Sequence, residues 1–220
     1  MLYRHSEATL ALLRRKPVIP VLTVHDVEDA RAQARALIAG GLTVFEITLR
    51  TPAALAALKA LAKEFLQACI GAGTVITADQ AVAAAAAGAA FLVSPGMSPA
   101  LIEAAIDSPV PFLPGIATAS EAMALQERGF RAMKFFPAEP AGGVKYLASL
   151  AGPLPELIFW PTGGIDQTKA KDYLALSNVA CVGGSWMVAP SLIIAHDFGA
   201  VEELARGACA LGGGSDRSSK

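Results

Sequence analysis

Lys134 stands in the middle of an apolar run at residues 131–138, Arg-Ala-Met-Lys-Phe-Phe-Pro-Ala, which is typical of a buried strand. Burial disfavours the protonated form of an amine, and the uncharged amine is a nucleophile that attacks ketones. Lys134 is therefore a candidate for forming a Schiff base with a carbonyl substrate. The alternative interpretation is a structural lysine whose head group extends to solvent at the end of the strand.

A carboxylate and a guanidinium share one face of a second strand-like run, at residues 42–50. Side chains alternate along a strand, so Glu46 and Arg50 point one way while Phe45 and Ile47 point the other. A carboxyl group beside a buried amine can both accept and donate protons, which makes Glu46 a candidate general acid and base. A structural ion pair between Glu46 and Arg50 is the competing interpretation.

Two glycine pairs follow the last two strand-like runs, in Pro-Thr-Gly-Gly-Ile at 161–165 and in Val-Gly-Gly-Ser-Trp at 182–186. Consecutive glycines expose backbone N–H groups, and a helix that begins just after them adds the positive end of its dipole. This pattern favours a phosphate site over simple turns. The residues that we expect to line it are Thr162, Gly163, Gly164, Gly184 and Ser185.

The other strand ends carry weaker signals. The run at 69–75 contains Gly-Ala-Gly-Thr, where glycines let the backbone approach a ligand and the Thr74 hydroxyl can bind a carboxylate. The small residues at 94–96, which include Pro95, and those at 114–116 are typical of tight turns in a pocket wall.

These residues need a scaffold that brings several strand ends together. Strands separated by single helices pair in parallel with right-handed crossovers, and eight such units favour a (β/α)8 TIM barrel over an open doubly wound sheet. The strand-like runs are 18–24, 42–50, 69–75, 91–95, 111–117, 132–138, 157–161 and 179–182. The helix-like runs between and after them include 26–39, 52–65, 81–90, 99–106, 120–128, 166–174 and 190–211.

Two further segments lie outside these units. Residues 6–16 resemble an extra helix, which we expect to cap the amino-terminal mouth of the barrel. Residues 212–220, Gly-Gly-Gly-Ser-Asp-Arg-Ser-Ser-Lys, lack the apolar side chains that a packed core needs and are interpreted as a flexible tail. We therefore predict one barrel domain over 1–211.

Composition restricts the classes of partner. The 220 residues carry a formal net charge of only −1, without a basic stripe, so neither nucleic acid nor a membrane surface is an expected partner. No apolar run resembles a membrane span or a signal peptide, which indicates a soluble, cytoplasmic protein. The three cysteines and three histidines are scattered, so we expect no metal site.

Six short blocks, in order, resemble the 2-keto-3-deoxy-6-phosphogluconate (KDPG) aldolases, class I lyases of the Entner–Doudoroff pathway. The resemblance runs from about residue 17 to residue 186 and is weaker beyond. Its departures are the bulky Trp160 and the Gly-Ser-rich tail. The blocks are Glu-Ile-Thr-Leu-Arg at 46–50, Gly-Ala-Gly-Thr at 71–74, Ser-Pro-Gly at 94–96, Lys-Phe-Phe-Pro-Ala-Glu at 134–139, Pro-Thr-Gly-Gly at 161–164 and Gly-Gly-Ser-Trp at 183–186.

The resemblance implies a homotrimeric barrel that cleaves a phosphorylated 2-oxo sugar acid into pyruvate and glyceraldehyde 3-phosphate without a cofactor. It also implies activity on 4-hydroxy-2-oxoglutarate (KHG). Lys134 matches the Schiff-base lysine and Glu46 the general acid and base. Arg50 and Thr74 match positions that hold the pyruvyl carboxylate. The remaining expected substrate contacts are Pro95, Phe136, Thr162, Gly163, Gly164, Gly184 and Ser185.

Three other functions remain open on the sequence. An aldolase for the galactonate epimer needs the same lysine and carboxyl group. A phosphate-binding barrel isomerase would use Glu46 as a base, with Lys134 only as a positive charge. A non-catalytic trimeric scaffold would need neither residue, although both are intact in this chain.

Overall fold

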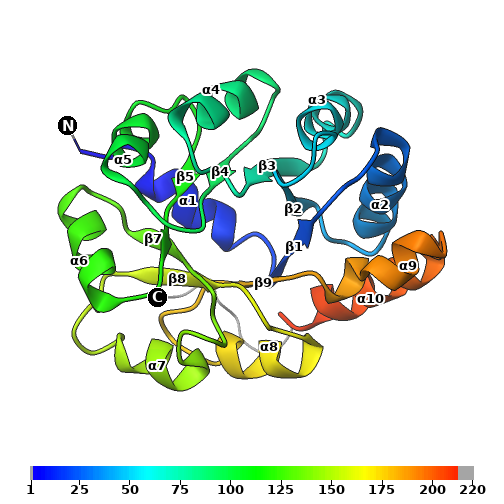
Figure 1. Ribbon diagram of the computed structural model, residues 1–220. Helices are drawn as coiled ribbons and strands as arrows, with labels where there is room; N and C mark the ends of the chain where they lie inside the picture. Colours follow the sequence, from blue (N-terminus) through cyan, green and yellow to red (C-terminus); the bar gives the residue numbers. More distant parts are fainter. Residues whose placement is uncertain (1, 213–220) are drawn as a thin grey trace.

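The computed structural model describes residues 2–212, in which strands and helices alternate after a first helix (Figure 1). The predicted tail at 212–220 lies outside the described residues, apart from Gly212. The strands are β1 (Val18–Leu22), β2 (Val44–Thr48), β3 (Cys69–Gly73), β4 (Leu92–Val93), β5 (Phe112–Leu113), β6 (Gly115–Ile116), β7 (Ala132–Phe135), β8 (Ile158–Pro161) and β9 (Val182–Gly184). The helices are α1 (Ser6–Leu13), α2 (Val27–Ala39), α3 (Ala54–Glu64), α4 (Ala78–Ala86), α5 (Pro99–Ile106), α6 (Ala119–Glu127), α7 (Gly143–Ser149), α8 (Gln167–Leu174), the short 3-10 helix η1 (Trp186–Val188), α9 (Pro190–Ile194) and α10 (Phe198–Ala210).

All the strand pairs are parallel, as the alternating pattern predicts. One sheet has the order β5-β4-β3-β2-β1-β9 and a second has the order β6-β7-β8. An isolated parallel bridge between Thr162 and Gly183 lies just beyond β8 and within β9. The result is an α/β fold in which curled parallel strands carry the helices on their outer side (Figure 1).

Several helices begin where the chain offers a side chain that can satisfy their first free N–H groups. An oxygen of the preceding residue accepts a hydrogen bond from the first turn of α2, α4, α5, α6, α8 and α10, and each such cap is worth about 1 kcal/mol. These caps fix where each strand-to-helix loop ends. The capping residues are Asp26, Thr77, Ser98, Thr118, Asp166 and Asp197.

Two expected elements are interrupted. The single strand predicted over 111–117 is wrong, because β5 and β6 are separated at Pro114, which has no N–H to donate to a ladder. The single helix predicted over 190–211 is also wrong. It is two helices, α9 and α10, because His196 adopts a left-handed φ of 50° and Asp197 caps a new helix.

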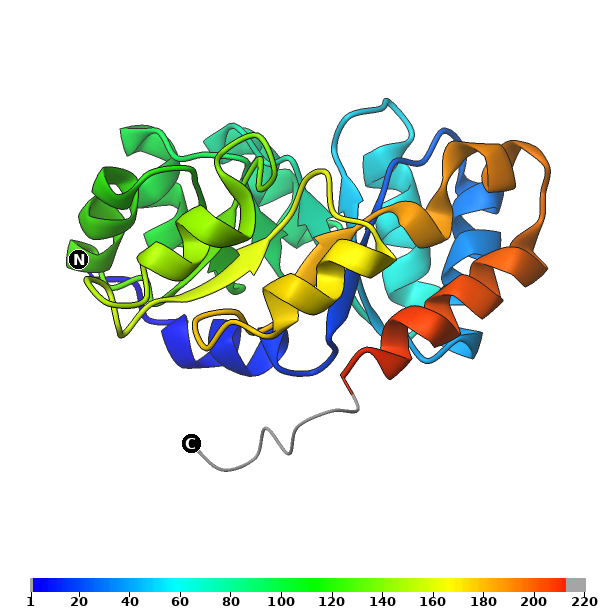
Figure 2. The ribbon, with the colours of Figure 1, turned by 90° about the horizontal axis from the view of Figure 1, so that it is seen from below.

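One strand boundary differs from the expectation, and one helix was not predicted. The last strand lies at Val182–Gly184 and not at 179–182, and Val179 forms only an isolated bridge with Phe159. Helix α7 was not among the predicted segments. It lies with α8 and α10 along one flank of the molecule, outside the strands (Figure 2). Within residues 2–212, no helix is both long and apolar enough to cross a membrane.

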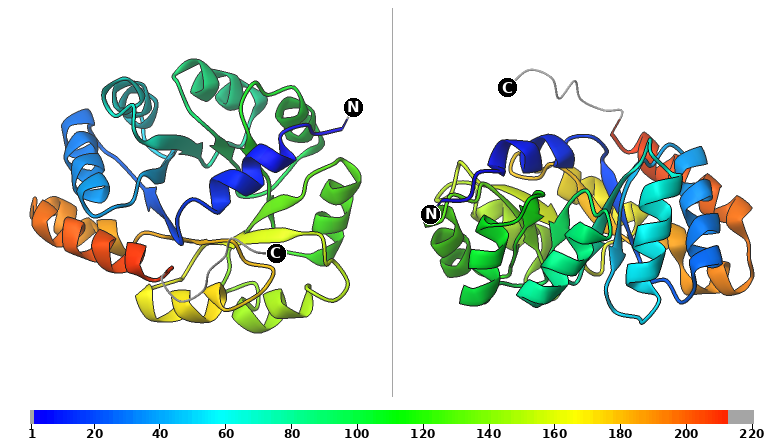
Figure 3. Two further views of the ribbon diagram at one scale, coloured as in Figure 1. Left: turned by 180° about the vertical axis from the view of Figure 1, so that it is seen from behind. Right: turned by 90° about the horizontal axis from the view of Figure 1, so that it is seen from above.

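Apolar side chains pack on both faces of the strands, as expected of parallel sheets. Phe45 and Ile47 belong to the large cluster between strands and helices. Alternate residues form a second, inner cluster, which Leu12 and Leu13 of α1 also join, and α1 crosses the middle of the strand assembly seen from behind (Figure 3). The inner cluster contains Leu12, Leu13, Ile19, Val44, Phe91, Val93, Leu113, Ala132, Trp160, Ala180 and Cys181.

Substitution of Gly71 tests how tightly the side chains of this inner cluster are packed. A methyl group at Gly71 would overlap the ring of Phe91, whereas one at Gly152 would meet nothing within 4 Å. We therefore expect Gly71→Ala to lower the free energy of unfolding by about 1–3 kcal/mol in urea denaturation, with Gly152→Ala as a near-neutral control. Adding Phe91→Leu to Gly71→Ala should recover part of the loss. Equal stability of Gly71→Ala and wild type would contradict the packing.

Candidate active site

Lys134 of β7 and Glu46 of β2 meet in the interior, as the alternation of their strands predicts. Lys134 Nζ lies 3.1 Å from Glu46 Oε1 and donates a hydrogen bond to it. The lysine is 4% exposed and the glutamate 0%. A lysine that extends to solvent is therefore excluded. The alternative ion pair between Glu46 and Arg50 is also wrong, because Glu46 pairs with the lysine.

Two aromatic rings border the amine. The centroid of the Trp160 ring lies 4.9 Å from Lys134 Nζ, and that of Phe136 lies 5.5 Å away. Trp160 is the register partner of Lys134 on β8, so the two side chains point into the same interior space. The backbone N–H of Lys134 donates a hydrogen bond to the backbone carbonyl oxygen of Pro114, at 2.8 Å. The amine is thus held at a fixed depth between ring faces that favour a cation.

Gly73 provides the space that the Glu46 carboxylate occupies. A Cβ atom at this position would lie 2.5 Å from Glu46 Oε1. We expected the glycine-rich end of β3 to leave room for a ligand. At Gly73 it leaves room for the Glu46 carboxylate instead. The second oxygen, Glu46 Oε2, is buried and has no hydrogen-bond partner among residues 2–212. A carboxylate with one free oxygen can take up a proton from a substrate.

Arg50 and Thr74 lie together beyond the ends of β2 and β3. Arg50 Nε donates to Thr74 Oγ1 at 3.0 Å. Arg50 forms no ion pair with another described residue, so its charge is available to a ligand anion. Thr74 has a φ of 57°, a left-handed conformation that costs a β-branched residue about 1–3 kcal/mol. Such strain is concentrated at functional sites, which agrees with the expected role of this pair.

Pro95 lies next to the strand that neighbours Lys134. Gly115 is the register partner of Lys134, and a methyl group at Gly115 would overlap the Pro95 backbone. Ser94 Oγ accepts a hydrogen bond from Gly115 N–H at 3.2 Å. The loop after β4 is therefore fixed against the wall of the site, where the sequence placed it.

The two glycine loops also lie side by side, because the bridge between Thr162 and Gly183 joins their strands. Gly163 and Gly164 have φ values of 110° and 78°, which favour glycine. Thr162 Oγ1 is buried and has no hydrogen-bond partner among the described residues. All five expected phosphate residues therefore occupy adjacent strand ends.

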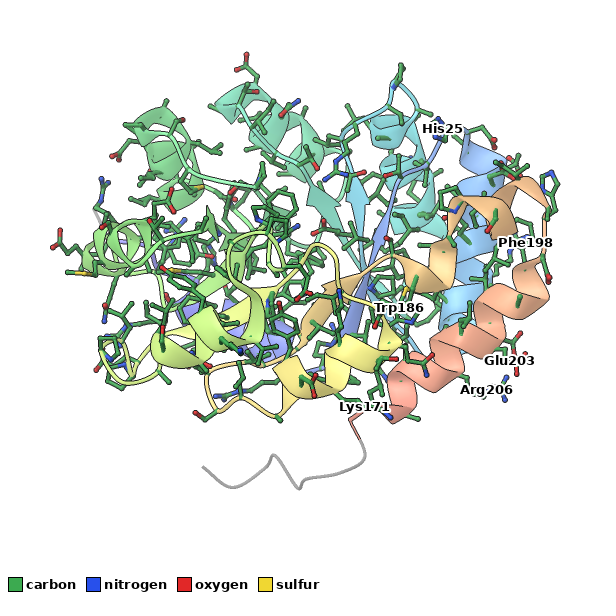
Figure 4. All side chains as sticks on the ribbon, turned by 60° about the horizontal axis from the view of Figure 1, so that its bottom comes forward. His25, Lys171, Trp186, Phe198, Glu203 and Arg206 are labelled. Atoms are coloured by element: carbon green, nitrogen blue, oxygen red, sulfur yellow. The ribbon has the colours of Figure 1, made fainter. Side chains whose placement is uncertain are left out.

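The second loop differs in detail from the first. Gly184 is buried against the ring of Trp186, which lies where β9 runs into η1 (Figure 4). Ser185 is exposed. Its backbone N–H donates no hydrogen bond within residues 2–212 and is therefore available to a ligand.

The expected contribution of a helix terminus is smaller than the sequence suggested. Asp166 Oδ1 accepts hydrogen bonds from the N–H groups of Thr168 and Lys169, both at 2.9 Å, so two of the first donors of α8 are already occupied. After β9 the chain forms only the three-residue η1. The amides of the glycine loops therefore carry most of the expected binding of an anion.

The sequence did not indicate a charged cluster behind the first glycine loop. Tyr173 Oη donates to Glu139 Oε1 at 2.6 Å, and Lys169 Nζ lies 2.8 Å from Glu139 Oε2. Hydrogen bonds from Lys169 and Tyr173 lower the pKa of Glu139, and the bond to Glu139 raises the pKa of Lys169. A signal was present, because Lys169 and Tyr173 are one turn apart on one helix face.

The structure offers no sign of a metal site in the part of the chain that it describes. Within residues 2–212, no three His, Cys, Asp or Glu side chains are grouped so that they could hold an ion. His25, which lies closest to a strand end, is exposed in the loop after β1 (Figure 4).

Known proteins resemble this chain in both sequence and structure. A family model described as "Aldolase: KDPG and KHG aldolase" matches residues 10–204. The KHG/KDPG aldolase of Escherichia coli is 46% identical over 196 residues, which cover 89% of this chain and 92% of that protein. The KDPG aldolase from Legionella pneumophila, with pyruvate captured as a covalent carbinolamine intermediate, has a TM-score of 0.89 and 44% identity over 91% of this chain and 97% of its own. The enzyme of Zymomonas mobilis with 3-phosphoglycerate has a TM-score of 0.87 and 43% identity over 91% and 94%.

The buried pair predicts a distinctive pattern of stability. Lys134→Met or Glu46→Leu alone leaves one buried charge without its partner, so each should lower the free energy of unfolding by about 3–5 kcal/mol. The double variant should lose less than either single variant, because it leaves neither charge unpaired. Urea denaturation of the four proteins measures this coupling. Losses that simply add would show that the two groups do not depend on each other.

Proposed function

The chain belongs to the KDPG and KHG aldolase family, and we propose that it is a class I aldolase that cleaves KDPG into pyruvate and glyceraldehyde 3-phosphate. The observation that carries this proposal is the buried contact of 3.1 Å between Lys134 Nζ and Glu46 Oε1. An amine and a carboxylate in contact, shielded from water, supply a nucleophile and a proton carrier at one point.

In the first half of the reaction, Glu46 accepts a proton from Lys134 and the neutral amine attacks the C2 ketone. The carbinolamine hydroxyl then takes up that proton and leaves as water, which gives an iminium. The C3–C4 bond then breaks, and its electron pair moves towards the iminium nitrogen to give an enamine. Glu46 takes the proton of the C4 hydroxyl as that bond breaks, so the phosphorylated aldehyde leaves as a neutral carbonyl group. The ring faces of Trp160 and Phe136 stabilise the positive charge on the nitrogen.

In the second half, Glu46 returns its proton to C3 of the enamine and restores the iminium. Water then adds to C2, the carbon–nitrogen bond breaks, and pyruvate leaves with Lys134 regenerated. Glu46 thus serves as base and as acid in one cycle, which requires it to stay beside the nitrogen throughout. Gly73 makes that position possible, because a larger residue would displace the carboxylate.

The two ends of the substrate are held by different strands. We assign the carboxylate to Arg50 and Thr74, whose guanidinium and hydroxyl groups are suited to a planar anion. We assign the phosphate to the glycine loops after β8 and β9, at Gly163, Gly164, Gly184 and Ser185. We assign Pro95 and Thr162 to the middle of the substrate, between its carboxylate and its phosphate. Binding at both ends orients the ketone towards the amine.

The name of one relative indicates KHG as a second substrate. The Escherichia coli relative is named a KHG/KDPG aldolase, and we extend both activities to this chain. KHG lacks the phosphate but keeps the 2-oxo acid, so it needs the same lysine, carboxyl group and arginine. The galactonate epimer of KDPG is the alternative sugar acid, and comparison of the pure epimers separates the two preferences.

We also propose the quaternary and cellular setting. Residues 1–211 form one domain, in which the two sheets close into a (β/α)8 barrel with α1 at its amino-terminal mouth. The bridge between Thr162 and Gly183 and the entry of Leu12 and Leu13 into the inner cluster support this closure. Cys69, Cys181 and Cys209 are in the thiol form, which suits a reducing cytoplasm. The homotrimer rests on the family resemblance.

Replacement of the proton carrier tests the mechanism. Glu46→Gln keeps the shape of the side chain but cannot shuttle a proton, so kcat for pyruvate release from KDPG should fall about 100-fold or more. The coupled reduction of released pyruvate by NADH gives the rate. Glu156→Gln makes the same change at an exposed glutamate paired with Arg131 and should leave kcat unchanged. Full activity of Glu46→Gln would remove Glu46 from the reaction.

A further inference from the structure

Three consecutive carbonyl groups at the first glycine loop, residues 162–164, all accept hydrogen bonds. Thr162 O accepts from Ala138 N–H at 2.8 Å, and Gly163 O accepts from Glu139 N–H at 3.1 Å. Gly164 O accepts from Lys169 Nζ at 3.1 Å. All three donors belong to the segment after β7 or to the lysine paired with it.

These bonds determine where the loop amides point. In a planar trans peptide, the N–H of each residue is directed opposite to the carbonyl group before it. Carbonyl groups bonded to residues 138–139 and to Lys169 therefore direct the following N–H groups away from these donors. The N–H groups of Gly164 and Ile165 donate no hydrogen bond to any described residue, so they remain available to an anion. Successive amides of this kind form an anion-binding concavity.

One of the three bonds depends on side chains, and those side chains hold one another. Lys169 Nζ is shared between Gly164 O and Glu139 Oε2, while the buried Tyr173 donates to Glu139 Oε1. We call Glu139, Lys169 and Tyr173 the clamp. Its fit to the loop is close, since a Cβ atom at Gly164 would lie 2.8 Å from Glu139 Cγ.

The charges of the clamp also suit an anion nearby. Glu139 is a carboxylate directly behind the glycine loop, and alone it would repel a phosphate group. Lys169 lies 2.8 Å from it and offsets its charge, while the neighbouring Asp166 carboxylate, which also acts on Glu139, accepts hydrogen bonds from two amides of α8. Loss of the lysine would therefore both release the Gly164 carbonyl group and expose an unpaired negative charge.

We propose that the clamp positions the first glycine loop for phosphate, and so determines affinity for the phosphorylated substrate without taking part in bond cleavage. The inference rests on the proposed function, because it concerns the phosphate end of the same site. It assigns a role to three residues that the reaction chemistry does not use. Lys169 is the member whose loss removes both the hydrogen bond to the loop and the neutralising charge.

The test compares Lys169→Met with Lys171→Met. Lys171 is an exposed lysine on the same helix (Figure 4) and forms no ion pair with another described residue, so it is the matched control. We expect Lys169→Met to raise KM for KDPG about tenfold, with kcat changed less than about twofold. Competitive inhibition by inorganic phosphate should weaken by a similar factor. Lys171→Met should behave as wild type in both measurements.

A phosphate-free reaction separates positioning from general damage. Exchange of the methyl protons of pyruvate with deuterium, followed by NMR, requires Lys134 and Glu46 but no phosphate group. It should proceed at the wild-type rate in Lys169→Met. Tyr173→Phe, which removes one hydrogen bond to the carboxylate and keeps the ring, should raise KM for KDPG by about threefold and also leave exchange unchanged.

Two results would contradict the proposed role of the clamp. One is an unchanged KM and an unchanged inhibition by phosphate in Lys169→Met. The other is an equal loss of KDPG cleavage and pyruvate exchange, which would indicate a purely structural role. Failure of the proposed function is distinguishable, because then the wild type itself would neither cleave KDPG nor exchange pyruvate. In that case, calorimetric binding of inorganic phosphate to wild type and Lys169→Met still decides the inference.

Discussion

The organisation of this protein depends on a buried ion pair between Lys134 and Glu46. Neither group is stable alone in an apolar interior, because a charge removed from water needs a partner. Parallel strands β2 and β7 bring the two side chains to 3.1 Å, and Gly73 leaves room for the carboxylate. The surrounding rings exclude water while favouring a cation. The buried amine and carboxylate are therefore already in the positions that Schiff-base chemistry requires.

The rest of the site extends from this pair along the carboxyl ends of the strands. Arg50 and Thr74 lie beyond β2 and β3, and the side chain of Thr74, whose backbone is strained, accepts a hydrogen bond from the arginine. The glycine loops lie beyond β8 and β9, joined by the bridge between Thr162 and Gly183. A substrate with an anion at each end can thus be fixed across the amine, and orientation of this kind can account for much of a rate enhancement.

The sequence predicted the parts of this account that depend on periodicity. Alternation along a strand predicted that Glu46 would face the interior, and the apolar run around Lys134 predicted a buried amine. Contacts between segments that are distant in the sequence were harder to predict. Periodicity does not reveal that Gly73 is opposite a carboxylate, or that Asp166 occupies the first amides of α8. Backbone interruptions at Pro114 and His196 were also missed, because apolar residues lie on both sides of each.

A Schiff-base mechanism requires the Lys134 nitrogen to form a covalent bond with a 2-oxo acid. Reduction of the protein with borohydride in the presence of pyruvate, followed by peptide mass analysis, tests this directly. We expect one modified peptide, carrying the mass of pyruvate less one oxygen atom on Lys134, and no such modification when pyruvate is omitted. Modification of a different lysine, or an unmodified Lys134 after reduction at saturating pyruvate, would contradict it.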